Sequence, residues 1–166
     1  MIRIAINNAN ILIDLCDIDL LNELTQLNLE LHTTDFVINE IRNVEQINQL
    51  NKIIADNKLI INSFNPTELL AIILKNQSVS SLSIQDCSVW HIAELKNAMI
   101  LTGDNVLRKT VKKHDIEVHG ILWILDELII QKIISKYTAY EKLVFLMEIN
   151  PRLPKKACTE RLENWK

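Results

Sequence analysis

Apolar residues along the chain switch repeatedly between two spacings. Short apolar or alternating runs predict β-strands, and longer stretches with apolar residues three and four positions apart predict helices. The expected strands are residues 2–6, 29–34, 58–62, 98–101 and 116–118. The expected helices are residues 10–24, 35–43, 45–55, 66–74, 83–97, 121–134 and 138–148, one after Asp104 and a last one ending at Trp165. Strands that alternate with helices predict the α/β class, with a mainly parallel sheet covered on both faces.

The composition is that of a globular protein. The chain has 166 residues, 48% hydrophobic and 23% charged, which is enough for one domain with a sizeable core. Its three cysteines, Cys16, Cys87 and Cys158, show neither a CxxC nor a zinc spacing, so we expect reduced thiols in a cytoplasmic protein. The N-terminus lacks a charged leader followed by a long apolar run, so no signal peptide is expected. Charged residues interrupt the most apolar later stretch, residues 121–134, so no membrane span is expected.

The charge pattern offers one local basic side. A net charge of −3 gives no global basic field, so any nucleic-acid binding needs a local patch. The helix after Asp104 places four cations on one side: Arg108, Lys109, Lys112 and Lys113. This side suits an RNA backbone, although a solvated helix face is the simpler explanation of it. Neither a dinucleotide-binding nor a P-loop glycine motif is present.

Three carboxylates stand in the first turns after predicted strands or connectors. They are Glu40, Asp86 and Asp104. Each also has a purely structural explanation: Glu40 as an edge residue that reaches solvent or forms a salt bridge, Asp86 as half of a capping box with Ser83, and Asp104 as a helix N-cap. At one edge of a parallel sheet the three charges repel one another, and Mg²⁺ or Mn²⁺ removes that cost. Such an ion can activate water at a phosphodiester.

Four segments carry a resemblance to a known family. They read Asn-Ala-Asn-Ile-Leu-Ile-Asp-Leu at 8–15, Val-Ile-Asn-Glu-Ile at 37–41, Leu-Ser-Ile-Gln-Asp at 82–86 and Leu-Thr-Gly-Asp at 101–104. In this order and spacing the chain resembles the PIN-domain family of metal-dependent ribonucleases, and especially the toxins of bacterial toxin–antitoxin pairs. The resemblance implies an α/β/α sandwich with strand order 3-2-1-4-5. It implies one domain over 1–166, with the α/β core in 1–120 and a C-terminal helical extension in 121–166.

The resemblance also implies an acidic site with one or two Mg²⁺ or Mn²⁺ ions, at which metal-activated water hydrolyses RNA. Glu40, Asp86 and Asp104 match the family's positions, whereas Asn8 stands where the family usually has Asp. An amide oxygen can coordinate a hard cation, but it brings no charge and is a poorer proton acceptor. The predicted catalytic and metal-binding residues are therefore Asn8, Glu40, Asp86 and Asp104, with activity reduced or absent in this chain. Deliberate inactivation, natural loss of activity, or compensation by a neighbour such as Asp14 would each explain Asn8, although Asp14 fits an exposed helix position better.

Three functional hypotheses follow. The first is a metal-dependent endoribonuclease of the toxin type, with an RNA substrate, an antitoxin and a second copy in a homodimer as partners. The apolar surplus of helices 10–24 and 121–134 suits such an interface. The second is a catalytically silent PIN-like module that binds RNA or protein. The third, a phosphatase of the haloacid-dehalogenase type using Asp17 and Asp19, is disfavoured because Asp17 falls inside a helical pattern.

Overall fold

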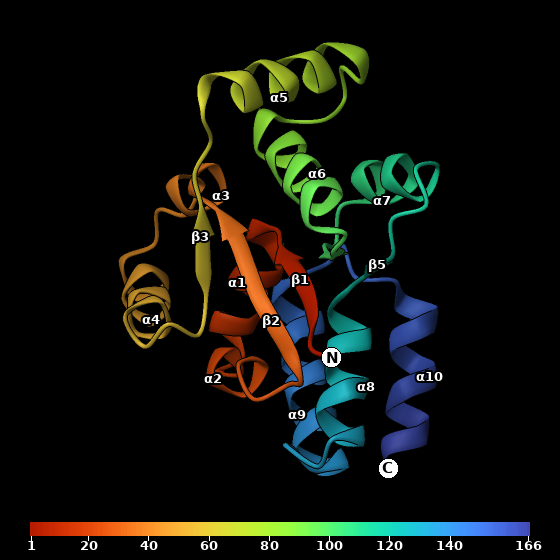
Figure 1. The fold of residues 1–166 in the computed structure, drawn as a ribbon. Helices are drawn as coiled ribbons and strands as arrows, with labels where there is room; N and C mark the ends of the chain where they lie inside the picture. Colours follow the sequence, from red (N-terminus) through yellow and green to blue (C-terminus); the bar gives the residue numbers. More distant parts are fainter.

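A five-stranded parallel sheet forms the centre of the computed structural model, which describes residues 1–166 (Figure 1). The strands are β1 Arg3–Asn7, β2 Leu29–Thr34, β3 Ile60–Asn62, β4 Met99–Leu101 and β5 Val118–His119. Their order is β3-β2-β1-β4-β5, and every neighbouring pair is parallel. Both the predicted α/β class and the strand order implied by the resemblance are confirmed.

Ten helices surround the sheet (Figure 1). They are α1 Ala9–Asp17, α2 Leu21–Leu24, α3 Asp35–Glu40, α4 Val44–Ala55, α5 Pro66–Ser78, α6 Ile84–Lys96, α7 Asn105–Lys112, α8 Ile121–Ile130, α9 Lys136–Ile149 and α10 Lys155–Trp165. In Figure 1, α5, α6 and α7 lie in the upper half of the molecule, whereas α2, α8, α9 and α10 lie in the lower half. None of the ten is both long and apolar enough to cross a membrane.

The inner strands β1 and β4 consist largely of apolar residues because helices cover both of their faces. Ala5 and Ile6 of β1 and Ile100 and Leu101 of β4 are completely buried. The register pairs Ala5 with Met99 and continues to the ends of both strands. The chain therefore leaves β1 and β4 at the same level of the sheet, and the residues after these ends become neighbours.

A turn residue and a capping residue explain why two predicted helices end early. The predicted helix 10–24 breaks into α1 and α2 at Asp19, whose backbone takes a left-handed conformation with φ 55° that Asp tolerates better than most residues. The predicted extension of the next helix to Asn43 is also wrong, because α3 ends at Glu40. Ile41 is extended, and the side chain of Asn43 accepts the N–H of Gln46 at 3.1 Å, which starts α4 instead.

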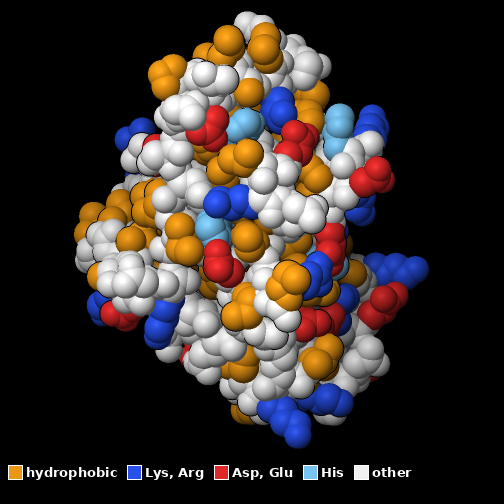
Figure 2. All heavy atoms as spheres, in the orientation of Figure 1, with side chains coloured by type: hydrophobic (Ala, Val, Ile, Leu, Met, Phe, Trp, Pro, Cys, Tyr) orange, Lys and Arg blue, Asp and Glu red, His pale blue; other side chains and the backbone are white.

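Apart from the exposed Ile130, the apolar surplus of residues 10–24 and 121–134 lies inside the chain's own core or packs against it. Ile11, Leu15 and Leu24, and on α8 Ile124 and Leu128, are almost inaccessible to solvent. This surplus therefore does not support the predicted homodimer interface. Large apolar side chains remain outside on α5, where Leu70, Ile73 and Leu74 are exposed, and Figure 2 shows hydrophobic side chains gathered over that helix.

Candidate functional site

The carboxyl ends of the strands bring the predicted site residues toward one edge of the sheet. Asn8 directly follows β1 and caps α1, and Asp104 caps α7 after β4. Glu40 is the last residue of α3, which begins directly after β2. Asp86 lies in the first turn of α6, the helix that packs against β1, β2 and β4. This edge is where α/β folds place their ligands.

The side chain of Asn8 makes three hydrogen bonds at this edge. It is only 3% exposed, and its Oδ1 accepts the N–H of Ala9 at 3.0 Å. Its Nδ2 donates to Asp86 Oδ1 and to Thr102 Oγ1, both at 3.0 Å. The neighbours determine this orientation, because a carboxylate oxygen can only accept and a backbone N–H can only donate. Asn8 therefore turns its donors toward Asp86.

Asp86 takes part in both interactions that the sequence left open. Its Oδ2 accepts the N–H of Ser83 at 3.2 Å, and Ser83 Oγ accepts the N–H of Asp86 at 3.0 Å, so the predicted capping box is confirmed. Its other oxygen is the acceptor for Asn8. Each oxygen of this carboxylate thus accepts one hydrogen bond.

Thr102 and Asn10 complete the hydrogen-bond network, and the prediction did not include them among the site residues. Thr102 is completely buried, and its Oγ1 accepts the N–H of Asp104 at 3.1 Å besides the amide of Asn8. The Nδ2 of Asn10 lies 3.5 Å from the same hydroxyl oxygen, and its Oδ1 accepts the N–H of Gly103 at 2.9 Å. The available signal was their position, since polar residues that follow adjacent parallel strands meet at one edge.

Glu40 and Asp86 influence each other electrostatically. Glu40 is an exposed residue at the end of α3, which agrees with the structural explanation of an edge residue that reaches solvent. It forms no salt bridge. Partial burial of the carboxyl raises the pKa of Glu40, and the negative charge of Asp86 raises it further. Two of the predicted acidic residues therefore do lie near each other.

Asp104 serves mainly as the cap of α7. Its Oδ1 accepts the N–H of Leu107 at 2.8 Å, as an N-cap residue does. No hydrogen bond links it directly to Glu40 or Asp86, and its connection to Asp86 runs through Thr102 and Asn8. The N-cap prediction is confirmed for this residue.

The basic side of α7 begins directly after this cap. Lys109, Lys112 and Lys113 are exposed, and Arg108 is half-buried. No carboxylate forms a salt bridge with any of the four. A Cβ added to Gly120 would lie 3.0 Å from Nη1 of Arg108, so this guanidinium packs against the start of α8. Four cations without counter-ions thus follow the acidic residues along the chain.

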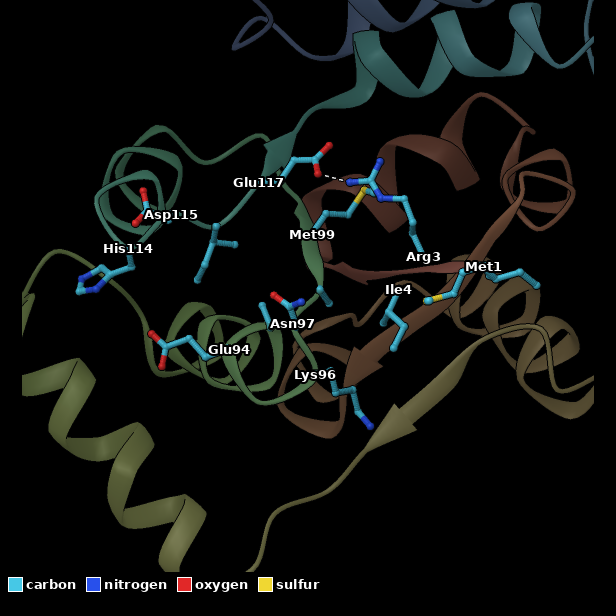
Figure 3. A pocket seen from close by; sticks show the side chains of 14 residues that line it. Met1, Arg3, Ile4, Glu94, Lys96, Asn97, Met99, His114, Asp115 and Glu117 are labelled. Atoms are coloured by element: carbon cyan, nitrogen blue, oxygen red, sulfur yellow. Dashed lines mark hydrogen bonds and ion pairs between the residues drawn. The ribbon is translucent and has the colours of Figure 1, made fainter.

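A pocket lies at the opposite edge of the sheet. It has a volume of about 610 Å³ and is lined by residues from the amino ends of β1, β4 and β5, including Ile4, Met99 and Glu117 (Figure 3). Arg3 forms an ion pair with Glu117 beside it. None of the predicted site residues lines this pocket.

A comparison with protein families now adds to this geometry. The family model described as a PIN domain matches residues 4–166. The chain belongs to the PIN-domain family. PIN domains are generally nucleases and typically use divalent metal ions. No curated protein matches the chain.

The residues of this PIN domain, as arranged, do not fit the expected ion. No group of three or more His, Cys, Asp or Glu side chains lies close enough together to hold a metal. Asn8 turns its nitrogen rather than its oxygen toward Asp86 and Thr102. The oxygens of Asp86 accept two hydrogen bonds. The catalytic and metal-binding roles of Asn8, Glu40, Asp86 and Asp104 therefore stay predictions.

Asp14 does not compensate for the missing charge. The prediction of an exposed helix residue is wrong, because Asp14 is half-buried and both of its oxygens accept Nδ2 of Asn150, at 3.2 and 3.1 Å. Burial raises the pKa of Asp14 to about 6, the amide of Asn150 lowers it and the charge of Asp17 raises it. Asp14 thus joins α1 to the end of α9 rather than extending the acidic edge. Asp17 ends α1 rather than a strand, so the phosphatase motif lacks its structural context.

Proposed function

We propose that this PIN domain binds RNA at the carboxyl edge of its sheet and, with Asn8 in place, does not cleave it. The observation that carries the proposal is the basic side of α7, whose four cations have no carboxylate partners. A net charge of −3 gives the molecule no general affinity for polyanions. Lysine and arginine that face RNA phosphates gain affinity by releasing counter-ions.

The absence of cleavage follows from the chemistry of Asn8. An amide carries no negative charge and does not act as a proton acceptor at neutral pH. Its Nδ2 hydrogen atoms occupy the space between Asp86 and Thr102. The edge therefore retains groups that can bind a nucleic acid, whereas the arrangement that metal-dependent cleavage requires is incomplete.

A second candidate is the metal-dependent endoribonuclease of the toxin type. The observation in its favour is the influence of Asp86 on the pKa of Glu40, which indicates that two carboxylates are close together. For this candidate we expect Mg²⁺ or Mn²⁺ as cofactor, an antitoxin partner and a homodimer in the cytoplasm. The exposed apolar side of α5, formed by Leu70, Ile73 and Leu74, is the surface that we would assign to such a partner.

The test combines binding and cleavage on one sample. Fluorescence anisotropy with a labelled single-stranded RNA measures binding, and a denaturing gel of the same mixtures with MnCl₂ or EDTA measures cleavage. We expect saturable binding that weakens with salt, and intact RNA under both conditions. Cleavage by the wild-type protein that EDTA abolishes would favour the second candidate, and a lack of RNA binding would contradict the proposal.

A further inference from the structure

Asn8, Asp86 and Thr102 are joined by hydrogen bonds, and we call them the carboxyl-edge centre. We infer that the amide of Asn8 holds this centre together in the place of a cation, and that the substitution Asn8→Asp creates a divalent-cation site there. The inference concerns the same centre as the proposed function and relies on it only for the role of that centre. One atom, the Nδ2 of Asn8, prevents an ion from binding here, because it lies 3.0 Å from both Asp86 Oδ1 and Thr102 Oγ1.

The carboxylate of Asp86 is half-buried in the first turn of α6. A buried or half-buried carboxylate needs donors, and a bond to an ionised acceptor is stronger than a bond between neutral groups. Asp86 receives one donor from its own capping box, at Ser83, and the second from Asn8. Each of its two oxygens therefore accepts a hydrogen bond from a group of this chain.

The side chain of Asn8 is fixed by hydrogen bonds at both ends of its amide. It is nearly inaccessible to solvent, and both ends of its amide are used, because Oδ1 accepts the N–H of Ala9 while Nδ2 donates twice. Rotating the amide would place its oxygen against the carboxylate of Asp86 and its NH₂ against the N–H of Ala9, and both contacts would be repulsive. Asn8 therefore cannot turn an oxygen toward Asp86 without losing these three bonds.

An aspartate at position 8 would change these contacts. It would keep an acceptor for the N–H of Ala9 but would replace the donor that faces Asp86 with a second negative oxygen about 3 Å away, a distance at which two carboxylates cannot both stay ionised without help. A divalent cation with oxygen ligands relieves this repulsion, and its affinity rises with the number of charged ligands. One substitution thus exchanges an amide donor for a requirement for an ion.

Thermal unfolding of three proteins in EDTA and in MnCl₂ tests the inference, with calorimetric titration of Mn²⁺ as a second readout. They are the wild type, Asn8→Asp, and Asn43→Asp as a matched control that adds the same charge at another helix N-cap. We expect the same melting temperature for the wild type in both buffers, because no ion is part of its centre. We expect Asn8→Asp to melt about 5 °C or more below the wild type in EDTA, to recover in Mn²⁺, and to bind Mn²⁺ at least about tenfold more tightly than the wild type. The control should behave as the wild type does.

Two results would overturn the inference. One is a wild-type protein that Mn²⁺ stabilises as strongly as it does the aspartate variant, because Asn8 would then itself be a ligand. The other is an aspartate variant that folds and is indifferent to Mn²⁺. Should that variant fail to fold, Mn²⁺ titration of ¹⁵N-labelled wild type decides: unchanged amide signals of Asn8, Asp86 and Thr102 support the inference, and their selective broadening contradicts it. A lack of RNA binding in the same samples would count against the proposed function alone.

Discussion

Thr102 is the residue on which the hydrogen bonds of the carboxyl edge converge. Its hydroxyl oxygen accepts the Nδ2 of Asn8 and the N–H of Asp104, and Nδ2 of Asn10 lies 3.5 Å away. A valine has nearly the same shape but no acceptor, so the donors would be left without a partner inside the protein. A buried donor without a partner costs about 1–3 kcal/mol.

We therefore expect Thr102→Val to lower the free energy of unfolding by about 2 kcal/mol or more, measured by urea denaturation. The matched control is Thr33→Val. Thr33 is equally buried, but its hydroxyl only donates to the carbonyl oxygen of Asn7 at 2.8 Å. Equal losses for the two variants would show that Thr102 is not the centre of this network.

Asp14 should make stability depend on pH. Burial raises the pKa of Asp14 to about 6, whereas its ordinary value is 3.8. Between these two values the folded state binds more protons than the unfolded state, so the free energy of unfolding falls as pH rises. The loss is complete above about pH 6 and amounts to about 2–3 kcal/mol.

Asp14→Asn should remove this decline and should be more stable than the wild type at pH 7. Urea denaturation at a series of pH values from 4 to about 7.5 measures it. Asp56→Asn, a change of an exposed carboxylate after α4, is the control and should keep the wild-type profile. A wild-type profile for Asp14→Asn would contradict the assignment.

At the scale of single residues, the sequence predicted what depends on near neighbours. The caps at Asp104 and Ser83 rest on contacts three residues apart, which spacing reveals. The bond from Gly103 to Asn10 spans 93 positions and that from Asn150 to Asp14 spans 136. Such contacts depend on how the layers pack, and no local pattern specifies them.

Among the helices, α7 is the one to which the proposed function assigns contact with RNA. It starts at the carboxyl edge and carries cations that no carboxylate neutralises. Reversing the charges of Lys109 and Lys112 should repel phosphates without removing any buried group, since both side chains are exposed.

We expect Lys109→Glu/Lys112→Glu to weaken RNA binding about tenfold or more and to lower the slope of log affinity against log salt by about 1 to 2. Fluorescence anisotropy at several salt concentrations measures both. The control is Lys52→Glu/Lys58→Glu, which reverses two exposed charges near the amino end of β3. A similar loss in both variants would indicate a non-specific charge effect and count against α7.

The helix boundaries show why two elements differed from their predictions. Asn43 lies within an apolar pattern that continues past α3, yet its side chain is a good N-cap and starts α4. Asp19 interrupts another apolar pattern through a left-handed backbone. In both places a capping or turn residue outweighs hydrophobic periodicity, which alone does not mark where one helix ends and the next begins.

For the whole molecule, the strand order was accessible from the sequence through the resemblance, and the all-parallel sheet from the alternation of strands and helices. The fate of the apolar surplus was not accessible. Ile11 and Ile124 contribute to one continuous core, whereas apolar side chains stay exposed on α5 and on α9, for example Leu70 and Phe145. Which amphipathic face finds a partner inside the chain is decided only when all layers are assembled.

The whole molecule also presents two competing surfaces, the carboxyl edge and the pocket at the amino edge (Figure 3). The choice between them follows from chemistry rather than size. The amino-edge pocket mixes both signs of charge, with Arg3 paired to Glu117, whereas α7 offers cations without partners. RNA should therefore bind at the carboxyl edge.

Titration of ¹⁵N-labelled protein with a short single-stranded RNA tests this most directly, because amide signals report contacts residue by residue. We expect the changes to concentrate on Asn8 and Asn10, on Thr102 and along α7. Changes confined to the amino-edge residues such as Asn97 and Asp115, or no changes at all, would contradict the account.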